Sequence, residues 1–321
     1  MVDRNVSPNV HTFSIVVDAF CKEGMVRKAE DVLDVMIQRG EVPNVVTCTA
    51  LMDGYYLRGQ MEEAHKVFDS MLNRGLQPNI ISYSTLINGH CKKRRIDEAM
   101  HLFKEVSRKG LNHNIVTYNI MLHGLFENGK FAVARELFNE MLAEGQSPDV
   151  FTYNIVLDCM CKNRQFAEAF SFFRSMQNSE LYINIACYNI LINAACKDGK
   201  LEIAKELLNE LFSNGLQPNA RTYNAIINGL CQEGSLDEAK ELLTRMEDNG
   251  CFPTEVTYNV IVRGFLKKKQ TYEAMALLEK MRESGFSAAN STIEMLVEVL
   301  PTGEQDPTLL NMIRKLAPKD M

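Results

Sequence analysis

The chain has 321 residues, of which 46% are hydrophobic and 24% are charged, and its formal net charge at pH 7 is -6. This composition is typical of a folded chain and excludes intrinsic disorder. No apolar run approaches the roughly 18 residues that a membrane-spanning helix needs. The acidic balance, taken alone, argues against a nucleic-acid binder. Residues 1–10 lack both the apolar core of a secretory signal and the Arg- and Ser-rich pattern of an organelle transit peptide.

A period of 35 residues runs through the chain. Eight full copies occupy residues 10–289 without insertion or deletion, and an aromatic residue fills one slot in seven of them. Another slot is alanine in every copy: Ala29, Ala64, Ala99, Ala134, Ala169, Ala204, Ala239 and Ala274. A fixed period of this size predicts stacked supersecondary units, each burying its apolar face against its neighbours.

Each copy contains two amphipathic runs. In the third copy, Ile80–Lys92 and Ile96–Arg108 carry apolar or aromatic residues at i, i+3 and i+7, which is helical spacing. The break between the runs contains a glycine in five copies, which suits a left-handed helix end. A Gly-x-x-Pro-Asn string usually follows the second run and separates it from the next copy. The sequence therefore predicts an all-α solenoid of eight helical hairpins.

The two ends of the chain lie outside the eight copies. Residues 1–9 align with residues 71–79 and are interpreted as the tail of a preceding, truncated repeat, so we expect a fragment of a longer array or a truncated gene product. In residues 290–321 we expect a partial first helix over 290–300, a break over 301–307 and a short capping helix over 308–316.

The residue types that usually carry chemistry are scattered. The nine cysteines show no zinc or redox spacing and are read as small buried hydrophobes in a reducing compartment. The six histidines fall mostly in different slots, and no glycine-rich phosphate loop is present. Paired acids recur at solvated helix starts. We therefore expect no catalytic residues, no metal and no cofactor, and we predict that the chain is not an enzyme.

Two columns of short polar residues line up when the copies are superposed. The first column follows the aromatic slot, early in each first helix: Ser14, Thr49, Ser84, Asn119, Asn154, Asn189, Asn224 and Asn259. The second column follows the joint proline: Asn44, Asn79, Asn114, Asp149, Asn184, Asn219, Thr254 and Ala289. Stacking aligns the first column along one face. Backbone hydrogen bonding explains one or two such residues, and helix capping explains the second column equally well, so both interpretations stay open.

The recurring string Pro-Asn/Asp-x-x-Thr-Tyr-Asn, followed by Cys-Lys, Asp/Glu-Glu-Ala and a terminal Gly, resembles the pentatricopeptide repeat. The resemblance covers about 280 residues and is to the pure 35-residue (P-type) class, similar to restorer-of-fertility-like members. It implies a right-handed superhelical solenoid that binds single-stranded RNA, one base per repeat. The tetratricopeptide repeat is excluded, because its period is 34 residues and its landmarks include Trp, which this chain lacks.

The resemblance also implies which side chains read bases. Each first-column residue pairs with the second-column residue thirty further on, from Ser14 with Asn44 to Asn259 with Ala289. The family's code implies 5′-A-A-A-U-Y-Y-Y-Y-3′, where Y is a pyrimidine, and the Thr254 and Ala289 pairs depart from common combinations. Short Ser or Thr leaves room for a purine, and Asn reaches a smaller pyrimidine. Asp149 accepts only, which favours the N3–H of U.

A basic column lies eight residues beyond the first column. It consists of Lys22, Lys92, Lys162, Lys197 and Lys267, and Leu57, Glu127 and Gln232 interrupt it. We expect these lysines to contact RNA phosphates, although lysines at helix C-termini also act as caps.

The family resemblance implies a role in organellar RNA processing, stabilisation or translational control by occupancy, most simply in a plant mitochondrion and otherwise in a chloroplast. Single-stranded RNA is the expected partner, and an RNA-processing nuclease or another protein is the further partner to consider. No membrane and no small-molecule substrate are expected. Two alternatives remain: a scaffold that binds a peptide on its concave face, and a nuclease that relies on a further catalytic domain. A peptide groove would carry varied or aromatic residues in place of the first column.

Overall fold

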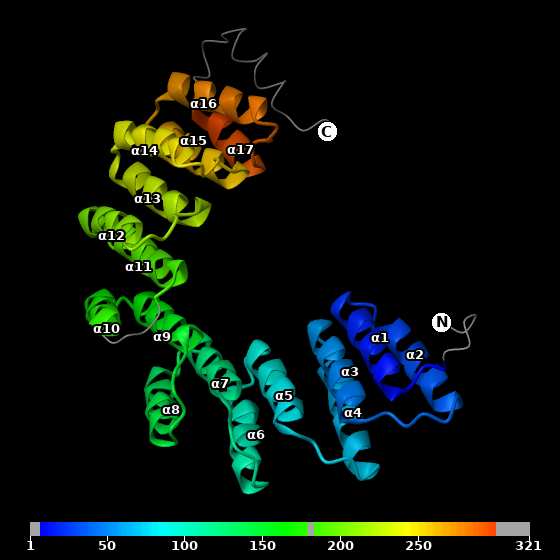
Figure 1. Cartoon of the computed structure of the whole chain (residues 1–321). Helices are drawn as coiled ribbons and strands as arrows, with labels where there is room; N and C mark the ends of the chain where they lie inside the picture. The colour runs from blue at the N-terminus through cyan, green and yellow to red at the C-terminus, as the bar shows by residue number, and fades with distance from the viewer. Residues whose placement is uncertain (1–6, 179–182, 300–321) are drawn as a thin grey trace. The chain divides into compact units, whose positions relative to one another are not determined.

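The computed structural model describes residues 7–178 and 183–299 (Figure 1). The first helices of the repeats are α1 (Val10–Lys22), α3 (Val45–Leu57), α5 (Ile80–Lys92), α7 (Ile115–Glu127), α9 (Val150–Lys162), α11 (Ile185–Lys197), α13 (Ala220–Glu233) and α15 (Glu255–Lys267). The second helices are α2 (Val26–Gln38), α4 (Met61–Asn73), α6 (Ile96–Arg108), α8 (Phe131–Ala143), α10 (Phe166–Asn178), α12 (Leu201–Ser213), α14 (Leu236–Asp248) and α16 (Thr271–Glu283).

The described residues contain helices and no strand, which confirms the all-α prediction. The partial ninth copy begins with α17 (Asn290–Val299), as expected. The predicted capping helix over 308–316 and most of the tail over 1–9 lie outside the described residues. The chain divides into two compact units, Met1–Ile155 and Val156–Met321.

Within each unit the helices form two layers. First helices of consecutive repeats pack against each other, α1 on α3, α3 on α5 and α5 on α7 in the first unit and α11 on α13, α13 on α15 and α15 on α17 in the second. The first helices α1, α3, α5, α7, α11, α13 and α15 also pack against the second helix of their own repeat. The invariant alanines lie where the layers meet, and all eight are fully buried. A larger side chain there would push the two helices of a hairpin apart, so the alanine slot follows from packing.

The stacking of first helices also depends on glycine. Cys91 on α5 packs against Gly124 on α7 so closely that a Cβ on Gly124 would lie 2.3 Å from the Cys91 Sγ. Cys21 meets Gly54 in the same way, and Cys231 meets Gly264. Burial raises the pKa of the Cys91 thiol to about 12, so this cysteine is an unreactive packing group. None of the nine cysteines forms a disulfide, and Cys161 and Cys251 are half-buried whereas the other seven are buried.

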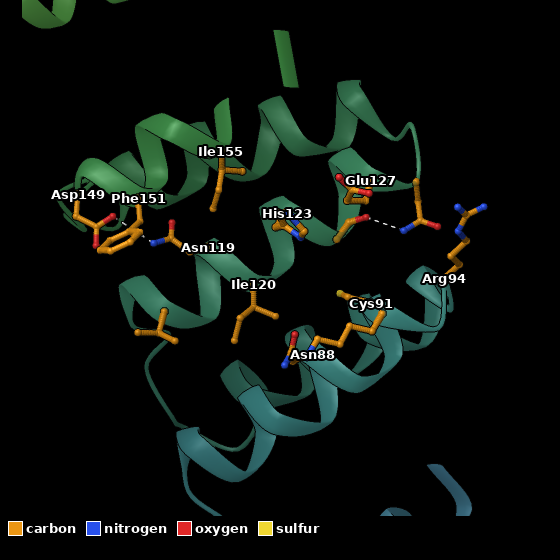
Figure 2. Close-up of a pocket in the computed structure, with 14 residues that line it drawn as sticks. Asn88, Cys91, Arg94, Asn119, Ile120, His123, Glu127, Asp149, Phe151 and Ile155 are labelled. Atoms are coloured by element: carbon orange, nitrogen blue, oxygen red, sulfur yellow. Dashed lines mark hydrogen bonds between the residues drawn. The ribbon is translucent and has the colours of Figure 1, made fainter. Parts of the chain in front are cut away.

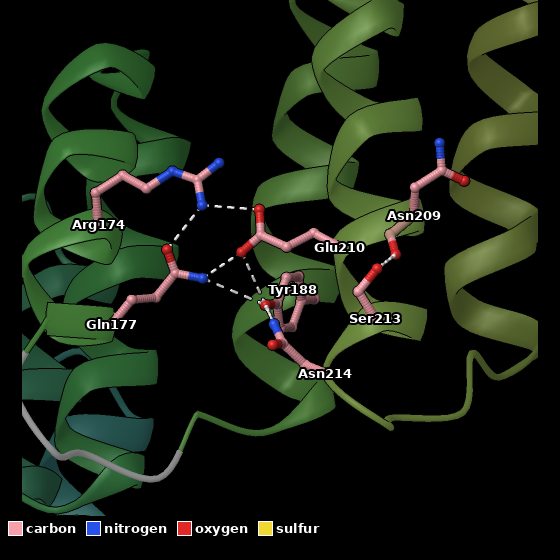
Figure 3. A network of polar contacts seen from close by, with 7 residues as sticks. All are labelled: Arg174, Gln177, Tyr188, Asn209, Glu210, Ser213 and Asn214. Atoms are coloured by element: carbon pink, nitrogen blue, oxygen red, sulfur yellow. Dashed lines mark hydrogen bonds and ion pairs between the residues drawn. The ribbon is translucent and has the colours of Figure 1, made fainter.

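In most copies the tyrosine of the aromatic slot is buried, but its hydroxyl makes hydrogen bonds at the edge of the core. In the second unit, the Tyr188 hydroxyl donates to Glu210 Oε1 at 3.0 Å and accepts from Asn214 Nδ2 at 2.6 Å. Glu210 also accepts from Arg174 and Gln177, which join α10 to α12 (Figure 3). Burial works to raise the pKa of Glu210, but these donors outweigh it and hold the pKa below its usual value. The network ties neighbouring hairpins together through one carboxylate.

A pair of histidines occupies the junction of the second and third repeats. His65 on α4 and His90 on α5 place their Nε2 atoms 3.0 Å apart, so one ring donates and the other accepts. His90 is buried, and its Nδ1 has no hydrogen-bond partner. The pKa of His90 is lowered to about 4, mainly by burial, with His65 and Arg95 contributing to the lowering and Glu98 opposing it.

We predict that this pair makes the junction acid-sensitive. Because the pKa of His90 is lower in the folded chain than its ordinary value of 6.5, the unfolded chain binds more protons between these values, and stability falls as the pH falls through this window. Between pH 7 and pH 4.5 the loss attributable to His90 is about 2–3 kcal/mol. Chemical denaturation of the parent and of His90→Asn at several pH values isolates it. Parallel pH profiles would contradict the assignment, and His123→Asn, at an exposed site, is the matched control.

Candidate nucleic-acid interface

The first column lies in the layer of first helices but is less exposed than its polar character suggests. Ser14, Thr49 and Ser84 are 4%, 8% and 7% exposed, and Asn259 is 5% exposed. Asn119, Asn154, Asn189 and Asn224 are half-buried. The column is therefore a row at the junctions between repeats, and the asparagines of the middle copies reach furthest toward solvent.

A row of buried hydroxyls, which the sequence analysis missed, explains this burial. The third residue of most first helices is Thr or Ser and is fully buried: Thr47, Ser82, Thr117, Thr152, Thr222, Thr257 and Thr292. Each of the first three hydroxyls meets the first-column residue of the preceding repeat, with Ser14–Thr47 at 2.7 Å, Thr49–Ser82 at 2.9 Å and Ser84–Thr117 at 2.8 Å. The signal in the sequence is a Thr or Ser two residues before most members of the first column.

Asparagine makes this contact differently. The Oδ1 of Asn119 accepts from Thr152 Oγ1 at 2.7 Å, and its Nδ2 donates to Asp149 Oδ1 at 3.3 Å. Asn189 contacts Thr222 and Asn219 in the same way. Asn259 accepts from the Ala289 backbone N–H at 2.9 Å. The structure thus brings the predicted pairs into direct contact in these three asparagine repeats.

The remaining pairs with described contacts are linked indirectly or not at all. Thr47 donates to Asn44, Ser82 to Asn79 and Thr117 to Asn114, so in the serine and threonine repeats one buried hydroxyl joins the two columns. Asn224 and Thr254 form no such link, because Thr257 bonds to Thr254 instead and the buried Oδ1 of Asn224 has no partner.

The second column caps the first helices. The side chains of Asn44, Asn79, Asn114, Asn184, Asn219 and Thr254 accept from backbone N–H groups in the first turns of α3, α5, α7, α11, α13 and α15. Asp149 accepts from the Thr152 N–H at 2.8 Å in the same way. The capping interpretation is therefore confirmed for these residues, and any reading of a ligand by them comes in addition to it.

Asp149 is the one carboxylate in this column. Burial works to raise its pKa, but hydrogen bonds from Thr152 and Asn119 outweigh burial and hold the pKa below its usual value. The group is therefore ionised at neutral pH and can only accept. The three hydrogen bonds that Asn119 and Thr152 donate to the carboxylate all end on Oδ1, and the Asp149 backbone N–H donates to Thr152 Oγ1.

A cavity of about 790 Å³ opens beside this pair, between α5, α7 and the start of α9 (Figure 2). Asn119, Asp149 and Phe151 lie at one end, His123 lies near the middle, and Arg94 lies at the other end. A smaller cavity of about 210 Å³ occupies the corresponding place between α13, α15 and α17, where Arg263 and Lys267 line it. The layer of first helices is therefore hollowed beside polar and cationic side chains in both units.

A row of exposed apolar residues borders the polar columns. It occupies the second position of the first helices, and its members are Val46, Ile81, Val116, Phe151 and Val256, which are 55–68% exposed. Val116 and Phe151 line the larger cavity. These residues fall outside the inward-facing period, which is why the sequence analysis passed over them, and their signal is an apolar residue just before the buried Thr or Ser.

The predicted basic column divides into paired and unpaired lysines. Lys22 bonds to Asp18 at 2.6 Å, and Lys162 bonds to Asp158 at 2.8 Å. The residue four positions earlier is asparagine for Lys92 and Lys197 and arginine for Lys267. These three form no ion pair within residues 7–178 and 183–299. Lys92, Lys197 and Lys267 are therefore the members of the column with a free ammonium group.

No three His, Cys, Asp or Glu side chains in the described part of the chain are grouped so as to hold a metal ion. Among the described helices, none has the length and apolar character needed to cross a membrane.

The repeat pattern and this geometry agree with known families. Models of the PPR repeat family match residues 43–92, 78–127, 113–162, 148–197, 183–232 and 221–267, and further PPR repeat models match residues 4–37 and 256–286. The chain belongs to the pentatricopeptide repeat family. This family is defined by its repeat and not by a catalytic activity. The closer resemblance to restorer-of-fertility-like members stays a prediction.

Solved structures of the family share the fold. The pentatricopeptide repeat protein PPR10 in complex with an 18-nt psaJ RNA element matches with a TM-score of 0.61 and 26% identity, over 88% of this chain and 46% of PPR10. A cysteine-to-serine variant of PPR10 with the same RNA element gives the same values. This chain therefore spans less than half the length of PPR10. The PPR domain of Arabidopsis thaliana protein-only RNase P 1 in complex with tRNA has a TM-score of 0.47 at 22% identity, over 56% of this chain and 94% of that domain. The comparison with curated proteins found no match.

We predict that the buried hydroxyls stabilise the junctions between repeats. Thr117→Val keeps the shape of the side chain but leaves the buried Ser84 hydroxyl without its partner, so we expect a loss of about 1–2 kcal/mol in the free energy of unfolding. Thr85→Val is the matched control, because the Thr85 hydroxyl bonds only to the Ile81 carbonyl at an exposed site. Equal denaturation midpoints for the two variants would show that the bridge contributes nothing.

Proposed function

We propose that this protein binds single-stranded RNA in a sequence-specific manner, with one base per repeat held along the layer of first helices. The observation that carries the proposal is the contact between Asn119 and Asp149, thirty residues apart in sequence, at the edge of a cavity that also exposes Phe151. The similarity to PPR10, whose structure contains an RNA element, supports it.

The cavity offers a base the two kinds of surface that it needs. Phe151 presents an exposed aromatic ring, on which bases stack regardless of their identity, and Val116 on the preceding first helix adds an exposed apolar contact. Polar atoms at the edge then discriminate between bases. Asn119 uses one Nδ2 contact and its Oδ1 within the protein, which leaves its second N–H for a ligand, and Asp149 Oδ2 takes no part in the contacts with Asn119 and Thr152.

The serine and threonine repeats present a different edge. The hydroxyls of Ser14, Thr49 and Ser84 are already committed to the next repeat, and their short side chains leave more space above them. A larger purine fits that space better than a pyrimidine. This supports the string A-A-A-U followed by pyrimidines as the preferred RNA. The last two repeats are the least defined, because Asn224 lacks its link and Ala289 has no polar side chain.

The role that fits such binding is occupancy. A strand held along the first helices is hidden from nucleases and from ribosomes, so the proposed outcome is stabilisation, processing by a separate nuclease, or translational control of an organellar transcript. The proposed location is a plant mitochondrion, with the chloroplast as the second choice.

We predict that Asp149→Asn changes base preference. Asn caps a helix about as well as Asp, so the fold is retained, but the side chain gains a donor and tolerates the bare N3 of C. At this half-buried edge we expect about 1 kcal/mol, or roughly fivefold, in the ratio of U to C affinity at the fourth nucleotide. Competition between two RNAs that differ only at that nucleotide measures the ratio. Asn114→Asp is the reverse substitution one repeat earlier and tests whether a carboxylate shifts the preference at the third nucleotide toward U. An unchanged ratio would reduce Asp149 to a helix cap.

We predict that the lysines contribute unequally. The three unpaired members together contribute about -2 to the slope of the logarithm of affinity against the logarithm of salt, at 0.7 per phosphate contact. Lys92→Ala lowers that slope by about 0.7 and weakens all RNAs alike, because phosphate contacts do not read sequence. Lys22→Ala has a smaller effect, since Asp18 already neutralises its charge. Binding measured over a range of salt concentrations gives both slopes. Identical slopes for the two variants would show that the ion pair with Asp18 does not reduce the contribution of Lys22.

A further inference from the structure

The turn that ends each first helix contains one residue in the left-handed region of the backbone. In five repeats this residue is glycine: Gly24, Gly59, Gly129, Gly199 and Gly234. In the other three it is a cation, with φ of 59° at Arg94, 60° at Arg164 and 58° at Lys269. Residues with a Cβ are disfavoured in this region, and the usual exceptions are Asn and Asp. Three long cations at this slot are therefore unexpected on grounds of backbone preference.

The cations at this slot have no structural partner that would explain them. The side chains of Arg94, Arg164 and Lys269 are exposed, and none forms a hydrogen bond or an ion pair within the described residues. A strained backbone conformation whose side chain makes no contact within the protein suggests that the side chain binds a ligand.

The residue just before this slot shows what a structural cation in the turn does. Arg58 donates to the Gly24 carbonyl of the preceding repeat at 2.7 Å. Lys93 and Lys268 lie against Gly59 and Gly234, with each Nζ 2.8 Å from the place that a Cβ would take. These three cations dock on the C-terminal end of the preceding first helix, where the dipole favours positive charge. Arg94 and Lys269 follow Lys93 and Lys268 directly but do not share that contact.

Arg94 faces the proposed binding surface. It lines the 790 Å³ cavity together with Lys92, at the end away from Asp149 and Phe151 (Figure 2). A guanidinium group offers a planar fork of donors that matches two phosphate oxygens. Polar and apolar groups for a base thus lie at one end of the cavity, and two unpaired cations lie at the other.

We propose that Arg94, Arg164 and Lys269 are phosphate-contacting residues, held on a left-handed backbone so that their cationic ends reach the phosphodiester chain of the bound RNA. The proposal rests on the proposed function and adds a second set of cations to the lysine column, in the third, fifth and eighth repeats. It assigns the backbone strain at these three turns to ligand binding.

The test separates stability from affinity. Arg94→Gly removes the charge and the strain together, so the midpoint of thermal unfolding is expected to stay the same or increase. The affinity of the variant for a single-stranded RNA carrying the A-A-A-U-pyrimidine string is expected to be about fivefold below that of the parent at 0.1 M salt and equal to it near 1 M, because loss of one phosphate contact changes the salt slope by about 0.7. Arg94→Lys keeps the affinity within twofold. Arg135→Gln, which removes an exposed charge from α8 in the other layer, is the matched control.

The reciprocal variant adds a cation where the fold has room. Gly129 holds the same slot in the fourth repeat with φ of 71°, and a Cβ there would meet only a Phe131 ring carbon at 3.8 Å. Gly129→Arg is expected to lower the unfolding midpoint and to raise the affinity about fivefold, with the salt slope steeper by about 0.7.

The outcomes are distinct. Loss of affinity in Arg94→Gly without loss of stability, together with the gain in Gly129→Arg, supports the assignment. If the parent binds RNA and Arg94→Gly binds it equally well, or no more weakly than Arg135→Gln, the assignment is overturned and the proposed function stands. If the parent does not bind single-stranded RNA, both are overturned.

Discussion

The close stacking of each first helix on the next is the constraint on which the rest of this structure depends. Small residues set the distance: glycine at 54, 124 and 264 admits the cysteine of the preceding repeat with no room for a Cβ. At that distance a buried hydroxyl such as Thr117 reaches the first-column residue of the repeat before it. A wider spacing would leave these hydroxyls buried and unpaired, which is costly. Packing and polar satisfaction therefore specify the same geometry.

This constraint also shapes the proposed binding surface. The first column lies at the junctions between repeats, so its polar atoms make hydrogen bonds to the next repeat, and only the remaining donors and acceptors are available to a ligand. The hydroxyls of serine and threonine in this column bond to the buried hydroxyl of the next repeat. The larger amide of Asn119 makes that bond with its oxygen and also contacts Asp149 with its nitrogen. The two classes of repeat thus differ in the space and in the donors that they offer, and this difference gives the proposed base preferences a physical basis.

The acidic net charge is compatible with an RNA-binding surface because the cations are divided among several tasks. Lys22 and Lys162 pair with aspartates four residues earlier, and Arg58, Lys93 and Lys268 dock on the preceding turn. Lys92 and Arg94 remain unpaired beside the larger cavity. What matters for phosphate binding is the local charge of the groove, which the sum over the chain hides.

The sequence by itself determined the repeat length, the hairpin unit, the helix bounds and the identity of the two polar columns. It could do so because helical periodicity, glycine and asparagine at helix ends, and a buried alanine are local signals that recur eight times. It also contained the i, i+4 spacing of Asp18 with Lys22, although the prediction of a uniform basic column did not use it.

Tertiary structure alone decided which polar atoms are free. The bridge from Ser84 to Thr117, the histidine pair at 3.0 Å and the contact of Asn119 with Asp149 all join residues 25 to 33 positions apart, and their geometry depends on how closely two repeats approach. Burial of Ser14, Thr49 and Ser84 could not be predicted from their polarity. The left-handed conformation of Arg94, Arg164 and Lys269 follows from the repeat, because they occupy the slot that is glycine in the other five copies. The structure added that their side chains are exposed and unpaired, which depends on what the neighbouring turns place beside them.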